Sequence, residues 1–111
     1  MLQYFWVINM KKLTKIYEVL RNVKLKELSY EQKELWLRAR IVIQFVTLRE
    51  QKGYNQQRIA DKMGVLRQQI TRFENMSNSP TISFLVRYAT ALDTTVDVIL
   101  NGVDQREISN G

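Results

Sequence analysis

The sequence predicts an all-α protein, on the evidence of where its chain breakers fall and how its apolar residues are spaced. The 111 residues contain one proline and four glycines. Between these breakers, apolar residues recur about every three or four positions, the spacing of a helix with one buried face. The internal breakers are Gly53, Gly64, Pro80 and Gly102. Only residues 2–8 leave room for the alternating pattern of a strand.

Two helices are predicted in the N-terminal half. Residues 12–24 form an amphipathic helix with Asn9 as its N-cap. Its apolar face consists of Leu13, Ile16, Tyr17, Leu20 and Val23. The second helix begins after Ser29, because Ser29 and Gln32 have the spacing of a capping box. We expect it to continue as far as Gly53.

Four shorter helices follow in the C-terminal half. They are predicted at residues 55–63, 67–75, 81–92 and 95–100. Asn55, Thr81 and Thr95 supply N-caps, and Gly64 with Val65 makes the turn between the first two.

The composition excludes several classes of chemistry. There is no cysteine and no histidine, so disulfides, thiolate or imidazole metal sites and serine–histidine catalysis are all impossible. Asp61, Glu74 and Asp97 are far apart in the pattern and have no accompanying nucleophile or phosphate loop. We therefore expect a protein that is not an enzyme and that uses neither a metal nor another cofactor.

The charge of the chain is uneven. The net charge is +6, with a basic excess in residues 1–79 and an acidic excess in residues 80–111. This distribution is typical of a protein that binds a polyanion or an acidic protein on one side, although solubility alone would produce the same charge.

The apolar stretch LQYFWVI at residues 2–8 is too short to span a bilayer and has no positively charged segment before it. Lys11 and Lys12 follow where a signal peptide would continue to be apolar. We expect a cytoplasmic protein with no membrane association, and Met1 and Met10 are both acceptable natural starts.

The helices at 55–63 and 67–75 are expected to meet across Gly64 and to turn polar residues outward. If Ile70 and Phe73 are buried, then Gln68, Thr71, Arg72 and Asn75 point away from the core, while Gln69 lies nearer its edge. Arg bonds guanine and Gln bonds adenine in a bidentate manner in the major groove of DNA. A DNA-reading helix is one interpretation of the row Arg67-Gln68-Gln69, and a solvated surface is the other.

One stretch of the chain carries a family resemblance. Residues 48–100 read LREQKGYNQQRIADKMGVLRQQITRFENMSNSPTISFLVRYATALDTTVDVIL, with LRxxKG, NQ, IA, a turn glycine, an EN pair and a proline in order. This order resembles the Cro/C1-type (Xre family) helix-turn-helix domain of phage repressors and bacterial regulators, over about residues 41–102. The resemblance implies a lambda repressor-like domain of five helices, preceded here by an N-terminal helical extension.

The resemblance also implies roles for individual positions. The residues expected to contact DNA bases are Arg67, Gln68, Gln69, Thr71 and Arg72. Those expected to contact DNA phosphates are Asn55, Gln56 and Asn75. Arg49 and Glu74 match an ion pair that ties the first helix of the family domain to its recognition helix. The chain departs from the family at Leu66, which replaces a Ser or Thr cap, and at Met76 and Asp93, which replace glycines.

The apolar residues of the C-terminal helices have a simpler interpretation. Those expected in the core are Ile59, Ala60, Met63, Ile70, Phe73, Leu85, Ala89, Leu92 and Ile99. Tyr54 and Tyr88 are expected to be packing residues and not platforms for base stacking.

Three regions are therefore expected, namely an extension at residues 1–40, the helix-turn-helix domain at 41–102 and a polar tail at 103–111. The segment IVIQFVTL at 41–48 is apolar on two faces and must be covered twice. Ile41, Phe45 and Leu48 serve the family core, which leaves Leu35, Trp36, Val42, Ile43 and Val46 to another partner. We expect residues 12–24 to cover this second face from the same chain or a partner subunit, joined by Tyr4, Phe5 and Trp6.

The resulting hypothesis is a sequence-specific DNA-binding transcriptional regulator. Because one helix-turn-helix reads few base pairs, we expect a homodimer on an inverted-repeat operator, with repression as its mode. The resemblance implies a dimer through the helix near residues 96–100 and the residues after it, and the N-terminal extension is an alternative or additional interface. The alternative is an antitoxin similar to the host-inhibition-of-growth (HigA-like) type, which binds a toxin protein through its extension and also binds DNA. A purely structural extension that completes the core is the remaining interpretation.

Overall fold

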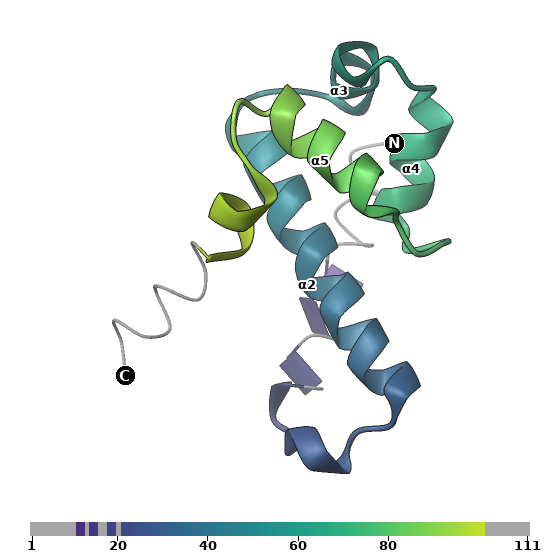
Figure 1. Ribbon diagram of the computed structural model, residues 1–111, viewed down its shortest axis with the longest axis vertical. Helices are drawn as coiled ribbons and strands as arrows, with labels where there is room; N and C mark the ends of the chain where they lie inside the picture. The colour runs from purple at the N-terminus through teal and green to yellow at the C-terminus, as the bar shows by residue number, and fades with distance from the viewer. Residues whose placement is uncertain (1–10, 13, 16–17, 20, 102–111) are drawn as a thin grey trace. The chain divides into compact units, whose positions relative to one another are not determined.

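The computed structural model describes residues 11–12, 14–15, 18–19 and 21–101, and every regular element in this part of the chain is helical. The expectation of an all-α fold is therefore confirmed. The chain divides into two compact units, Met1–Ile43 and Gln44–Gly111. The long helix α2 (Tyr30–Gln51) contains the boundary between them (Figure 1).

The first unit contains helical residues, a short 3-10 helix and the first part of α2. Residues 11–12, 14–15, 18–19 and 21 are helical, and η1 (Leu25–Glu27) follows. The capping box that begins α2 is present, because the backbone N–H of Ser29 donates to Gln32 Oε1 at 2.9 Å. The backbone N–H of Gln32 donates in return to Ser29 Oγ at 3.1 Å. These two bonds satisfy two of the free N–H groups at the helix start.

The middle of α2 is buried on more than one side. Its buried apolar residues are Ala39, Ile41, Val42, Phe45 and Val46. The expectation that residues 12–24 cover one side rests on Leu13, Ile16, Tyr17 and Leu20, which lie outside the described residues, as do residues 1–10 with Asn9. Of that apolar face, Val23 is described, and it is exposed after the last helical turn.

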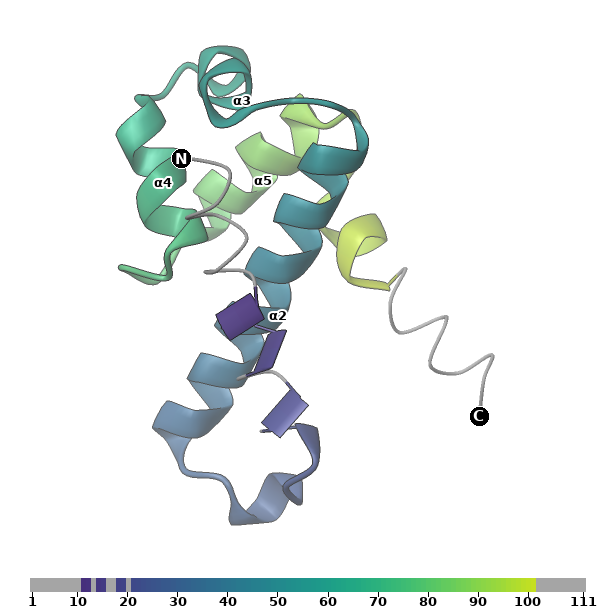
Figure 2. The same cartoon turned by 180° about the vertical axis from the view of Figure 1, so that it is seen from behind.

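The second unit contains the end of α2 and the remaining helices. These are α3 (Gln56–Met63), α4 (Arg67–Glu74), α5 (Ile82–Ala91) and a helical segment at residues 96–101. Figure 2 shows α3, α4 and α5 from behind. Together with α2 these make the five helices that the family resemblance implies.

The predicted caps explain where these helices begin and end. Asn55 accepts a hydrogen bond from the backbone N–H of Arg58, and Thr81 accepts one from that of Phe84. Thr95 caps the last helical segment in the same way. Gly64 ends α3 with a φ of 69°, a left-handed conformation that glycine adopts without steric strain.

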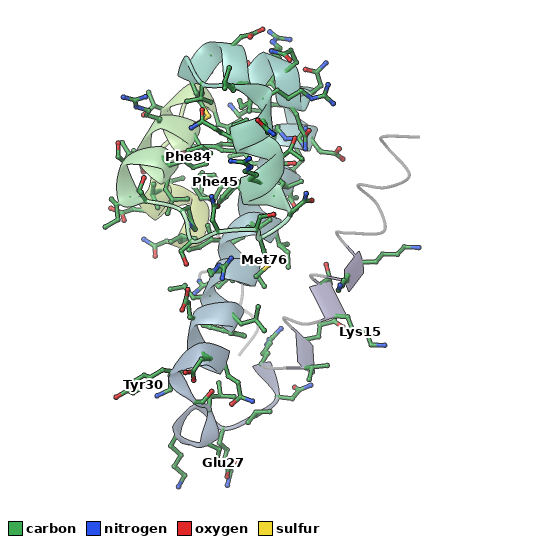
Figure 3. The ribbon with its side chains drawn as sticks, turned by 90° about the vertical axis from the view of Figure 1, so that its right-hand side faces the viewer. Lys15, Glu27, Tyr30, Phe45, Met76 and Phe84 are labelled. Atoms are coloured by element: carbon green, nitrogen blue, oxygen red, sulfur yellow. The ribbon has the colours of Figure 1, made fainter. Side chains whose placement is uncertain are left out.

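The core of the second unit is built around four aromatic rings. Phe45 of α2 contacts Phe73 of α4 edge-on with ring centroids 5.9 Å apart, and contacts Tyr88 of α5 at 5.1 Å. Phe84 completes the cluster at 5.3 Å from Phe73. Figure 3 labels Phe45 and Phe84 in the second unit. The nine residues predicted for this core are all buried, and Tyr88 is packed as expected. Among the described residues, no helix is long and apolar enough to cross a membrane.

Candidate nucleic-acid interface

Helices α3 and α4 are joined by a tight turn and are held together by small and apolar side chains. Ala60 is fully buried, and α3 contacts both α4 and α5. The turn is closed by the backbone N–H of Val65, which donates to the carbonyl of Ala60 at 3.0 Å. The direction of α4 is thereby fixed relative to α3.

The outward side of α4 is polar and basic. Ile70 and Phe73 face the core, whereas Arg67, Gln68 and Arg72 are exposed. Asn75, the residue that ends the helix, is exposed as well. Thr71 was expected to point away from the core, but its side chain is half-buried.

The N-terminus of α4 is capped by Gln69. Leu66 occupies the N-cap position and has no side-chain oxygen to offer. Instead, the backbone N–H of Leu66 donates to Gln69 Oε1 at 3.0 Å. This is the half of a capping box that a glutamine at the third helical position supplies. The side chain of Gln69 is therefore turned back along the helix start.

Gln56 stands at the first turn of α3 and links that helix to α4. It is half-buried, although the polar residues of this helix were expected to turn outward. Its Nε2 donates to Glu74 Oε1 at 3.0 Å, and its Oε1 accepts from Thr71 Oγ1 at 3.1 Å. These two bonds fix which end of the amide faces each partner.

A buried ion pair lies behind this face. Nε of Arg49 donates to Glu74 Oε2 at 3.0 Å, and Nη2 of Arg49 donates to Glu74 Oε1 at 2.8 Å. The hydroxyl of Tyr88 donates to Glu74 Oε2 at 2.9 Å. Both charged residues are about 4% exposed, so the pair ties α2 to α4 inside the core.

The electrostatics of this cluster follow from its burial and from the carboxylate. Burial by itself lowers the pKa of Arg49, but hydrogen bonding and the charge of Glu74 outweigh it and raise the pKa above its ordinary value. Burial first, and then the charge of Glu74, raises the pKa of Tyr88 well above its ordinary value. Tyr88 is therefore a neutral donor and Arg49 a cation across the physiological pH range.

An open cavity of about 220 Å³ lies beside α4. Its lining comes from Gln69, Arg72 and Phe73, from Phe84, and from residues 78–81 between α4 and α5. Met76, near the start of the loop between α4 and α5, has a φ of 60°. Asp93, which follows α5, has the same φ. Both positions hold a glycine in the family pattern, and the left-handed backbone explains that preference.

The sequence did not reveal every residue of this cluster. Tyr88 was expected to be a packing residue, and its hydroxyl bond to Glu74 was missed because nothing in the sequence places α5 against α4. The cap from Gln69 had a signal, since Leu66 and Gln69 have the spacing at which a glutamine side chain reaches the N-cap backbone. Among the described residues, no group of acidic side chains is placed to hold a metal ion.

A short helix, a glycine turn and a second helix with a polar outward side define a helix-turn-helix domain. Residues 47–99 match the family model of the helix-turn-helix domain. This match places a helix-turn-helix domain at residues 47–99, within the stretch that resembles the Cro/C1-type (Xre) family.

Three curated relatives indicate what the chain resembles. It is 35% identical over 60 residues to the HTH-type transcriptional regulator SinR of Bacillus licheniformis, across 53% of this chain and 54% of that protein. It is 33% identical over 60 residues to the uncharacterized HTH-type transcriptional regulator YqaE of Bacillus subtilis (strain 168), across 54% and 52%. It is 33% identical over 69 residues to antitoxin HigA1 of Mycobacterium tuberculosis (strain ATCC 25618 / H37Rv), across 62% and 46%. The chain spans about half the length of these relatives, and no solved structure gives a significant match.

Proposed function

We propose that this protein is a sequence-specific DNA-binding transcriptional regulator that inserts α4 into the major groove. The observation that carries the proposal is the exposed row of guanidinium and amide groups on α4, which a buried ion pair ties to α2. The helix-turn-helix match of residues 47–99 supports this use of the face.

The base-reading residues of the proposal are Arg67, Gln68, Gln69, Thr71 and Arg72. Arg67 and Gln68 stand at the start of α4, where a recognition helix meets base edges. Each good bidentate pair contributes roughly 1–3 kcal/mol of discrimination. Gln69 takes part through its Nε2 hydrogens, because its Oε1 caps the helix. Thr71 sits at the edge of the face beside Gln56.

The phosphate contacts of the proposal come from Asn55, Gln56 and Asn75. Asn55 and Gln56 lie at the N-terminus of α3, where backbone N–H groups and the helix dipole favour an anion. Asn75 lies just after α4. These contacts set the orientation of the domain on the duplex and are blind to sequence.

We propose further that the protein acts as a homodimeric repressor without a cofactor. Half-sites for such a dimer lie about 34 Å apart. Val98, in the helical segment at residues 96–101, is 62% exposed, which supports a dimer contact at this segment. The extension at residues 1–40 is the other candidate dimer surface. It precedes the helix-turn-helix domain that we propose at residues 41–102.

The test is a selection of random duplex DNA on the purified protein at a stated, near-physiological salt concentration. We expect an inverted repeat whose spacing reports the dimer geometry. Recovery of only salt-sensitive, sequence-blind binding would overturn the proposed specific function.

A second candidate function is that of an antitoxin in a toxin–antitoxin pair. Its support is the similarity to antitoxin HigA1, which extends over 69 residues. The test is co-expression with any small reading frame next to the gene, followed by co-purification and a growth assay. A complex that relieves growth inhibition would favour the antitoxin function. The absence of a complex would favour the transcriptional regulator.

A further inference from the structure

A chain of hydrogen bonds connects a fully buried tyrosine of α5 to the proposed phosphate-binding amide at the start of α3. Tyr88 bonds Glu74, Glu74 bonds Gln56, and Gln56 bonds Thr71. We infer that Tyr88 is a positioning residue for DNA binding, whose hydroxyl orients the Gln56 amide through the Glu74 carboxylate. This inference rests on the proposed function and deepens it.

The first step is that the Glu74 carboxylate is saturated with donors. Oε1 accepts from Arg49 Nη2 and from Gln56 Nε2, and Oε2 accepts from Arg49 Nε and from the Tyr88 hydroxyl. A carboxylate has about four lone-pair sites, and these four donors fill them. Any rotation of the group away from this position breaks at least two bonds inside the core.

The second step is that Tyr88 and Gln56 donate to different oxygens of the Glu74 carboxylate, Tyr88 to Oε2 and Gln56 to Oε1. If the hydroxyl is removed, Oε2 loses one of its two donors while it remains buried. An unsatisfied buried acceptor is costly, so the carboxylate turns toward other donors or admits water. A turn of the planar carboxylate moves Oε1 together with Oε2, and Oε1 is the atom that fixes Gln56 Nε2.

The third step is that a planar amide transmits this orientation to the surface. One N–H of Gln56 bonds Glu74 and its oxygen accepts from Thr71, so the second N–H of Nε2 points away from the carboxylate. Gln56 is half-buried at the first turn of α3, whereas Tyr88 is 0% exposed and cannot touch DNA itself. The effect of Tyr88 on binding must therefore pass through the polar chain.

Tyr88 is well suited to this role because its raised pKa keeps the hydroxyl protonated and donating. Its ring contacts Phe45, Phe73 and Phe84. Substitution by phenylalanine keeps these ring contacts and deletes the hydroxyl alone. Tyr88→Phe therefore separates the polar role from the packing role.

The experiment is a double-mutant cycle in DNA affinity. Duplex binding is measured for the unmodified protein, Tyr88→Phe, Gln56→Ala and the double variant, at a temperature where all four are folded by circular dichroism. The probe is a fluorescein-labelled duplex of the sequence that the unmodified protein selects, together with a scrambled duplex. Thr90→Val is the matched control, because it deletes an α5 hydroxyl that bonds only the Val86 carbonyl in the described contacts.

We expect Tyr88→Phe to weaken binding to both duplexes by about fivefold when Gln56 is present, the factor that corresponds to about one lost hydrogen bond. We expect a change of less than about twofold in the Gln56→Ala background, since the group on which Tyr88 acts is gone. Thr90→Val should leave the affinity unchanged. An equal loss in both backgrounds, or no loss with Gln56 present, would overturn the inference.

A second measurement keeps the inference separate from the proposed function. Side-chain amide resonances of Gln56 are recorded by NMR on the DNA-free protein. Tyr88→Phe should shift them and speed their exchange with solvent, and Thr90→Val should not. An unchanged Gln56 resonance would refute the positioning role, whereas an altered resonance in a protein that binds no duplex would refute only the proposed function. If Tyr88→Phe does not stay folded alone, both measurements are made in an Asp93→Gly background.

Discussion

Glu74 links four helices of the second unit through its carboxylate. Its carboxylate receives donors from Arg49 of α2, Gln56 of α3 and Tyr88 of α5, and is itself part of α4. A buried pair of this kind is weak evidence of net stability, but the loss of one partner strands the other charge. Single substitutions here should therefore have large effects.

Glu74→Gln should lower the free energy of unfolding by about 3–5 kcal/mol, because Arg49 is left charged and buried without its carboxylate. Urea denaturation measures the change. Glu34→Gln is the matched control: it removes the exposed carboxylate of Glu34, which lies 3.8 Å from Nη1 of the half-buried Arg38. That loss should stay below about 1 kcal/mol. Equal effects from the two substitutions would contradict the structural role of Glu74.

The loss in free energy of unfolding caused by Tyr88→Phe should depend on pH. At pH 7 the variant should lose about 1–3 kcal/mol, because Glu74 Oε2 keeps one donor fewer in the core. The raised pKa of Tyr88 means that the folded protein binds this proton more tightly than the unfolded chain. The stabilisation from this group is present below the ordinary tyrosine pKa of about 10 and is lost as the pH rises above it.

The gap in stability between the unmodified protein and Tyr88→Phe should consequently narrow at alkaline pH. Urea denaturation of both proteins at neutral pH and at about pH 10.5 tests this expectation. A gap that is constant or widens with pH would show that Tyr88 does not stay protonated in the folded state.

At the scale of single elements, the turns are decided by backbone conformation. Gly53 and Gly64 have φ values of 75° and 69° and end α2 and α3. Met76 and Asp93 adopt a φ of 60° without being glycines. Side chains in this region cost about 1–2 kcal/mol, and Asp tolerates it better than Met. The two non-glycine positions therefore hold strain that the family pattern avoids.

Met76→Gly should raise the free energy of unfolding by up to about 1 kcal/mol, since the relieved strain exceeds the entropy that glycine adds to the unfolded chain. Gly64→Ala should lower it by about 1 kcal/mol for the opposite reason. Nothing lies within 4 Å of a methyl group at Gly64, so that loss reports conformation alone. Thermal unfolding compares the two, and a change of the same sign in both would contradict this account.

The start of α4 can also be improved. Leu66 has the extended backbone of an N-cap, with φ −75° and ψ 144°, and is 69% exposed. Leu66→Ser adds the missing side-chain acceptor and should stabilise the fold by about 1 kcal/mol. Leu66→Ala removes the same side chain without an acceptor and serves as the control. If the alanine variant gains as much as serine in thermal unfolding, the cap is not the cause.

At the scale of the whole molecule, the proposed interface combines two kinds of contact from two helices. Gln68 lies on the exposed side of α4, while Gln56 is anchored at the start of α3 by Glu74 and Thr71. The first is proposed to read bases and the second to bind phosphate. Binding through base contacts depends on the DNA sequence, whereas binding through phosphate contacts depends on the salt concentration.

Gln68→Ala should relax preference at one base position and cost about 1–3 kcal/mol on the selected duplex only. Gln56→Ala should weaken binding to all duplexes alike. Binding titrations on the selected duplex and on single-base variants measure both effects. If both variants lose affinity equally on every duplex, the two proposed roles are not distinct, and if both unfold, the roles are assigned to the wrong residues.

Local patterns in the sequence predicted the helices of the second unit, the N-caps of three of its helical segments and nine of its buried residues. The capping box of Ser29 and Gln32, the N-caps at Asn55, Thr81 and Thr95, and the buried faces are local properties. They depend on the spacing of residues a few positions apart, so a sequence pattern contains them. The family resemblance then implied the pairing of Arg49 with Glu74 across 25 positions.

The hydrogen-bond partners of the polar groups in this cluster depend on how the helices pack against one another. Tyr88 lies 14 positions from Glu74, and Gln56 lies 15 from Thr71, so no local spacing predicts either bond. The amide oxygen of Gln69 accepts a hydrogen bond at the start of α4. The Gln56 side chain is half-buried in the packed domain. A buried carboxylate accepts from whichever donors the packed helices bring within about 3 Å, and that set is fixed only when the helices have docked.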